Sequence, residues 1–155
     1  MRKILSSSFL SLVMISLVGE HANAGDWAQF LGPDRNGVSA ETGLISAWPS
    51  AGPKIVWRTP LGVSMSGVAV AKGDAFTMFQ DETSQYVVCL NAADGKERWR
   101  TPVAPKYENA MGHGPRATPT VTNGQVFAFT GEGILVALKV DDGKQHWTVN
   151  VPKLL

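Results

Sequence analysis

A segment in the middle of the chain is repeated close to its end, and this repetition limits the possible folds more than any other feature. LNAADGKERWRTPV occupies residues 90–103, and LKVDDGKQHWTVNV occupies residues 138–151. Both contain Asp-Gly-Lys, then two variable residues, then Trp. The match is long enough to raise the question of whether it binds a ligand or builds the fold.

Two further alignments show that the repetition extends over the chain from residue 54 onward. KIVWRTPLG at residues 54–62 matches KERWRTPVA at 96–104, which makes Trp57 a third copy of the repeated Trp. Independently, VAVAKGDAFTMF at 68–79 aligns with TPTVTNGQVFAF at 118–129. Because two landmarks recur in the same order, the chain is an array of repeated units.

Each unit has the pattern of short β-strands. β-Branched and aromatic segments alternate with turn residues such as Asn123-Gly124, which is a strong hairpin signal. Four antiparallel strands in about every 40 to 50 residues are typical of a β-propeller blade. We therefore expect an all-β propeller fragment. The predicted strands are 67–71, 74–79, 85–91 and 97–103 in the first blade, and 117–122, 125–130, 134–140 and 145–151 in the second.

The repeat also divides the chain into segments. Propellers close with about four to eight blades, so two blades leave sheet edges open. We therefore expect the chain either to be an N-terminal fragment of a longer protein or to close its ring with other copies. The expected segments are a signal peptide at 1–24, a non-repeat segment at 25–53, the closing outer strand of a ring at 54–62, a first blade at 63–103, an inter-blade loop at 104–116 and a second blade at 117–155.

The repeated Asp-Gly and Trp residues are explained by the needs of such a fold. An Asp-Gly pair supplies the positive φ that turns the third strand of a blade into the fourth. The Trp then projects from the fourth strand, where its ring can pack on the neighbouring blade and its N–H can reach a carbonyl. The residues expected to dock blade on blade are Trp57, Trp99, Trp147, Asp94, Gly95, Asp142 and Gly143.

The N-terminus has the pattern of an export signal. Arg2 and Lys3 precede an apolar run at 4–18, and Ala22-Asn23-Ala24 matches a small-residue cleavage pattern. The run is too short and too rich in serine to span a membrane. The rest of the chain is close to neutral, which gives no reason to expect a nucleic acid partner. We expect an exported protein, periplasmic or extracellular, that is cleaved near Ala24.

The repeated motif also resembles a known family. AADGKERW at 92–99 and VDDGKQHW at 140–147 are similar to the tryptophan-docking motif of pyrroloquinoline-quinone (PQQ)-like repeat propellers. GDWAQFLGPDRNGVSAETGL at 25–44 and HGPRATPTV at 113–121 resemble a bacterial exported subgroup of that family. The resemblance implies a propeller, but such repeats build both quinoprotein dehydrogenases and a cofactor-free outer-membrane-assembly scaffold.

Two functions therefore stay open. The dehydrogenases of the family use a catalytic Asp, a calcium site and often a vicinal disulfide beside the quinone, whereas this chain has Cys89 alone. No catalytic or metal-binding residue can be matched to that pattern, and no cofactor is evident. The first hypothesis is a non-catalytic scaffold that binds a protein or a polysaccharide. The alternative is a dehydrogenase using PQQ and calcium, with most site residues beyond the end of this sequence.

The loop between the blades is the best candidate for a binding site. At about thirteen residues, 104–116 is longer than most connections, and long loops tend to be functional or mobile. The plainer interpretation is that Gly112, Gly114 and Pro115 merely shape a bend. The residues that could contact a ligand or partner are Tyr107, Glu108, Asn109, His113 and Arg116.

The aromatic residues of the non-repeat segment are the last sequence feature that bears on the fold. Trp27, Phe30 and Trp48 are too apolar for a free tail. We expect them to cover an edge or the floor of the propeller.

Overall fold

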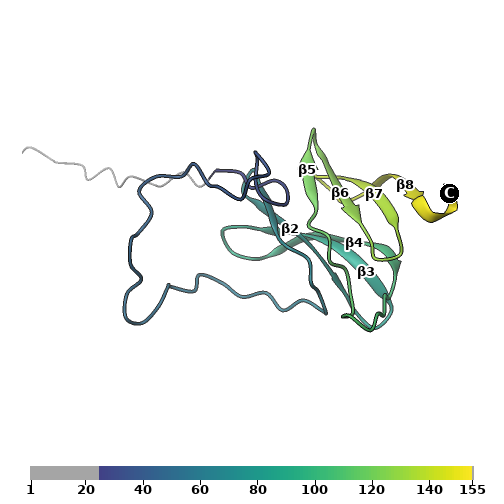
Figure 1. The fold of residues 1–155 in the computed structure, drawn as a ribbon, viewed down its shortest axis with the longest axis horizontal. Helices are drawn as coiled ribbons and strands as arrows, with labels where there is room; N and C mark the ends of the chain where they lie inside the picture. Colours follow the sequence, from purple (N-terminus) through teal and green to yellow (C-terminus); the bar gives the residue numbers. More distant parts are fainter. Residues whose placement is uncertain (1–24, 155) are drawn as a thin grey trace, which may run out of the picture.

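Two four-stranded antiparallel sheets form the body of the protein in the computed structural model, which describes residues 25–154 (Figure 1). In each sheet the strands lie in chain order, so each sheet is an antiparallel meander. A short 3₁₀-helix, η1 (Val151–Leu154), follows the last strand. The strands are β1 (Ala69–Ala71), β2 (Asp74–Gln80), β3 (Ser84–Asn91) and β4 (Glu97–Pro105) in the first sheet, and β5 (Thr120–Thr122), β6 (Gln125–Phe129), β7 (Ile134–Lys139) and β8 (Gln145–Asn150) in the second.

All eight predicted strands are present, with ends that differ from the prediction by at most three residues. The first strand of each sheet begins late, at Ala69 and Thr120. Before β1, the chain makes one backbone bridge to β2, at Val63 and Gln80, and side chains supply further bonds. Ser64 Oγ donates to the carbonyl of Met78 at 2.6 Å, and Thr77 Oγ1 donates to that of Gly67 at 3.0 Å. The chain is thus held beside β2 without forming a strand.

The opposite ends of the sheets carry different connections. We call one end the loop face, where the connections 81–83, 106–119 and 130–133 lie, and the other the turn face, where the chain reverses at 72–73, 92–96, 123–124 and 140–144. Figure 1 shows the long β4–β5 loop and the β5–β6 turn at opposite ends of the second sheet.

The main core lies between the two sheets. Alternate residues of β2 and β3, among them Phe76, Met78 and Val87, are buried against Val126 and Leu138 of the second sheet. Burial between sheets, and not within one sheet, therefore provides the main apolar contact that joins the two blades.

Residues 54–62 differ from the prediction. They were expected to form an outer strand, but they form no strand in the described part of the chain. A strand needs a backbone partner, and none of the described strands pairs with this segment. Instead, Trp57 and Leu61 pack on the other face of the first sheet, against Phe79 and Val88 among others.

The expectation for the non-repeat segment is only partly met. Trp27 is half-buried and pairs antiparallel with Val70 of β1. Phe30 and Trp48, however, are 65% and 67% exposed, so the prediction that they cover the propeller is wrong in this structure. Both residues lie in the segment between Trp27 and Trp57, which forms no strand and in Figure 1 runs for much of its length away from the sheets.

The predicted signal peptide lies outside the described residues. Within residues 25–154, no helix is long and apolar enough to cross a membrane.

Candidate functional site

The two blades are joined at the turn face by a Trp that sits on the turn of the next blade. Trp99 of β4 donates from Nε1 to the carbonyl of Val140 at 2.8 Å, and Thr101 Oγ1 donates to the carbonyl of Gly143 at 2.7 Å. Gly143 has φ of +69°, and a Cβ there would lie 2.5 Å from Cε3 of the Trp99 ring. Only glycine satisfies both the backbone angle and the close approach.

The same geometry recurs one blade earlier. Trp57 Nε1 donates to the carbonyl of Ala92 at 2.9 Å, and Thr59 Oγ1 donates to that of Gly95 at 2.6 Å. Gly95 has φ of +70°, and a Cβ there would lie 2.4 Å from the Trp57 ring. Residues 54–62 therefore supply a docking Trp even though they form no strand.

The carboxylates of these turns are used locally. Asp94 Oδ1 accepts a hydrogen bond from the backbone N–H of Lys96, and Asp142 Oδ1 accepts one from Lys144, both at 3.0 Å. These backbone donors hold the pKa of each carboxyl below its usual range. Both residues therefore stabilise a turn. The third repeated Trp, Trp147, is half-buried and packs on Phe127 with ring centroids 5.9 Å apart.

At the loop face, hydrogen bonds between polar groups of the inter-blade loop hold that loop in one conformation. Tyr107 O accepts from the N–H of Gly114 at 3.1 Å, and Tyr107 Oη accepts from Asn109 Nδ2 at 3.0 Å. Asn109 N donates to His113 Nδ1 at 3.4 Å. The Arg116 guanidinium lies 5.5 Å from the Tyr107 ring centroid and donates to Gly112 O at 2.9 Å. Four of the five predicted site residues thus form one folded loop.

The fifth predicted residue, Glu108, faces a different group. Its carboxylate lies 3.2 Å from Lys106 Nζ, which also lies 3.2 Å from Glu82. Glu108 and Glu82 raise the pKa of Lys106 above its ordinary value, chiefly through the hydrogen bond with Glu108. These charges line a hollow of about 370 Å³ together with Asp81 and His113.

Two buried glutamines anchor this loop, and the sequence analysis missed both. Gln80 and Gln85 face one another across the β2–β3 ladder and are almost fully buried. Gln80 Oε1 accepts from the N–H of Tyr107 at 2.9 Å, and Gln85 Nε2 donates at 2.8 Å to the Glu132 carboxylate of the second blade. The available signal was a polar residue at an inward position of each strand end.

The acidic side chains of the loop face among the described residues are engaged in local hydrogen bonds and ion pairs. Asp81 Oδ1 accepts hydrogen bonds from its own loop, including Thr83 N–H and Ser84 N–H, and they lower its pKa to about 2. No group of three or more candidate metal ligands occurs among residues 25–154. Cys89 is buried, and burial raises the pKa of its thiol to about 12, so its thiolate is suppressed.

The loop face provides a surface with an exposed apolar residue at its tip. The tip residue Met111 is 84% exposed, and the loop beneath it is held by hydrogen bonds to the first blade, while the Tyr107 ring packs on Gly131 of the second blade. Such an arrangement presents an apolar side chain and mixed charges on a rigid base, as a protein-binding surface does.

Comparisons with known proteins agree with this architecture. Residues 41–153 match a PQQ-repeat family described as outer membrane protein assembly factor BamB. A protein of that name from Yersinia pestis is 28% identical over 145 residues, which cover 84% of this chain and 34% of that protein. The chain thus spans about a third of the length of this curated relative.

Three solved structures are similar in part. BamB from Moraxella catarrhalis has a TM-score of 0.47 at 20% identity, over 61% of this chain and 27% of that one. A europium-containing methanol dehydrogenase gives 0.43 at 26% identity, over 54% and 14%. A quinohemoprotein alcohol dehydrogenase from Pseudomonas putida HK5 gives 0.46 at 19% identity, over 63% and 15%.

The family match covers most of the chain, and the fold consists of two four-stranded blades joined by Trp docking. The chain therefore belongs to the PQQ-like repeat family described as outer membrane protein assembly factor BamB.

Proposed function

We propose that this protein is exported to the periplasm and acts there as a non-catalytic propeller that supports the assembly of outer-membrane proteins. The observation that carries the proposal is the family match over residues 41–153. The loop face would supply the binding surface, since its Met111 tip is exposed and its Tyr107 is bonded to Gln80 of the first blade and packed on Gly131 of the second. No catalytic step is assigned to the chain.

A protein partner is favoured over a polysaccharide by the state of the loop aromatic. Sugars stack on free aromatic faces, but the Tyr107 ring already contacts Gly131 of the second blade and the Arg116 guanidinium. The exposed groups nearby are instead an apolar Met and charged side chains, which suit a protein surface.

The test is complementation in the host. Deleting the gene is expected to lower the amount of folded outer-membrane protein, measured by heat-modifiable migration on gels. The wild-type gene restores it, whereas a gene with Met111→Asp and Glu108→Lys does not. A matched variant at the turn face, Lys144→Glu, restores it. Normal outer-membrane protein after deletion would contradict the proposal.

A second measurement distinguishes the scaffold proposal from the dehydrogenase alternative. PQQ and calcium are added to the purified full-length protein, and the quinone absorption of the protein is recorded after removal of free cofactor. A stoichiometric bound chromophore would overturn the scaffold proposal. The proposal predicts none.

A further inference from the structure

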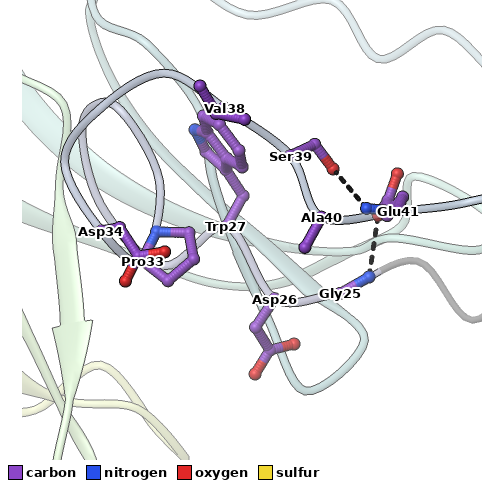
Figure 2. A pocket seen from close by; sticks show the side chains of 9 residues that line it. All are labelled: Gly25, Asp26, Trp27, Pro33, Asp34, Val38, Ser39, Ala40 and Glu41. Atoms are coloured by element: carbon purple, nitrogen blue, oxygen red, sulfur yellow. Dashed lines mark hydrogen bonds between the residues drawn. The ribbon is translucent and has the colours of Figure 1, made fainter.

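Gly25, the first residue that the structure describes, makes a contact that bears on the processing of an exported chain. Gly25 N lies 2.8 Å from Glu41 Oε1, sixteen positions later in the chain (Figure 2). Both residues line a hollow of about 240 Å³ next to the Trp27 ring, along with Asp26 and Asp34. The backbone nitrogen of Gly25 is thus placed directly on a carboxylate.

Glu41 is held in this position by a chain of local hydrogen bonds. Gly37 N–H donates to Leu31 O at 2.9 Å, and Val38 N–H donates to Asn36 Oδ1 at 2.9 Å. Ser39 Oγ accepts from the backbone N–H of Glu41 at 3.2 Å (Figure 2). The loop from 31 to 41 therefore returns Glu41 to the start of the segment.

The residues just after Gly25 tie the two blades together. Asp26 Oδ1 accepts from Lys72 N–H at 2.9 Å, and Trp27 exchanges two backbone hydrogen bonds with Val70 of β1. Ala28 O accepts from the N–H of Val121 in β5 at 2.8 Å. Residues 25–28 thus bridge the first strands of both sheets, so fixing Gly25 fixes this bridge.

We propose that the exported protein begins at Gly25 and that its new α-ammonium group forms an ion pair with Glu41. A signal peptidase of the host hydrolyses the Ala24–Gly25 peptide bond. The added water leaves a carboxylate on Ala24 and an ammonium on Gly25. The inference rests on the export that the proposed function includes. Processing would then strengthen the contact that holds the blade-bridging segment.

Cleavage changes the charge of the Gly25 nitrogen that contacts Glu41. Before cleavage, the Gly25 nitrogen is a neutral amide with one hydrogen. After cleavage it carries three hydrogens and a positive charge, so its bond to Glu41 becomes charge-assisted. The neighbouring hollow leaves room for the extra hydrogens, and the Asp26 and Asp34 carboxylates that line it add to the negative field. Asp26 Oδ1 already accepts from Lys72 N–H, which leaves Glu41 as the direct partner.

The pH dependence follows from the sign of this pairing. An ion pair raises the folded-state pKa of the α-amino group above its ordinary value of about 7.7 to 8.0. While Glu41 is ionised, the contribution to stability is therefore complete below about pH 7.7 and is lost as the pH rises through the raised pKa.

The first arm of the test maps the N-terminus. The full chain is expressed with its own leader in a Gram-negative host, purified from the periplasm and measured by mass spectrometry. The expected first residue is Gly25. A chain that starts elsewhere, or that keeps its leader, would overturn the proposal without bearing on outer-membrane assembly.

The second arm measures the ion pair in the processed protein. With ¹³C-glycine labelling, the Gly25 Cα shift is followed against pH for the wild type, Glu41→Gln and the matched control Asp34→Asn. The wild-type α-amino pKa is expected above 8, and Glu41→Gln is expected to lower it by roughly half a unit, the size an exposed pair supports. Asp34→Asn is expected to change it less. Equal values in the wild type and Glu41→Gln would overturn the pairing.

Discussion

A glycine and an indole ring determine each joint between blades. The ring of Trp99 occupies the space where a side chain at position 143 would begin, and Trp57 does the same at position 95. The glycine therefore has two separate roles, which are the positive φ of the turn and the close approach of the ring.

Those two roles can be separated by mutation. Gly143→Ala is expected to lower the free energy of unfolding by about 2 to 4 kcal/mol, because it adds a clash with Trp99 to the backbone strain. Gly124→Ala serves as the matched control. Its φ of +73° is similar, but no atom lies within 4 Å of the added Cβ. Urea unfolding of both variants measures the difference, and equal losses would show that the ring contact carries no energy.

The indole N–H contributes beyond the ring packing. Trp99→Phe keeps an apolar ring but leaves the Val140 carbonyl without its donor, so we expect a loss of about 1 to 3 kcal/mol in unfolding free energy. Trp147→Phe is the comparison, since that side chain is the more exposed of the two. The proposed docking role requires the loss at position 99 to exceed the loss at 147.

At the scale of elements, the β2–β3 connection is a small loop ordered by one carboxylate. Asp81 Oδ1 accepts from the Thr83 and Ser84 backbone N–H groups at 2.8 and 2.9 Å. The same connection bears on the long loop, because Thr83 O accepts from Lys106 N–H at 2.8 Å. A short connection of the first blade thus supports the candidate binding loop.

The depressed pKa of Asp81, about 2, gives this element a defined acid limit. Its stabilisation is complete above the ordinary value of about 3.9 and is lost as the pH falls through 2. The amide proton shifts of Thr83 and Ser84, followed by NMR, should titrate with that midpoint. In Asp81→Asn, which keeps an oxygen acceptor but cannot ionise, this titration is expected to disappear. A midpoint near 4 in the wild type would contradict the described hydrogen bonds.

The strands were largely predictable, whereas the base of the loop was not. Turn residues such as Asn123-Gly124 and alternating apolar residues mark strand positions locally, so all eight strands could be located from the sequence. Gln80 and Gln85 could not be assigned to the loop, because their partners Tyr107 and Glu132 lie 27 and 47 positions away. The exposure of Phe30 and Trp48 could not be predicted either, because it depends on the path of the long segment between Trp27 and Trp57.

For the molecule as a whole, the joint between blades is an apolar core closed by Trp99 at the turn face and by Gln85 and Glu132 at the loop face. Both ends join the blades. The surface proposed to bind a partner includes residues of both blades, so we expect its shape to depend on the contacts between them.

Removal of the polar joint should affect the loop face more than the fold. Glu132→Ala leaves the buried Gln85 amide without its carboxylate partner, and we expect a loss of about 1 to 3 kcal/mol in unfolding free energy. Hydrogen exchange of the loop 106–119 is expected to increase in this variant. The exposed substitution Asp141→Ala at the turn face is the control, and equal effects would show that the joint does not support the loop.

The central claim is that the loop face binds a protein of the outer-membrane assembly machinery. It is tested most directly by a photo-crosslinking residue placed at Met111, with a second protein carrying it at Lys144, whose side chain is 76% exposed at the turn face. After irradiation of living cells, the account predicts one discrete protein crosslinked from position 111, identified by mass spectrometry as a component of outer-membrane protein assembly, and none from position 144. A crosslink only from position 144, or none from position 111, would contradict it.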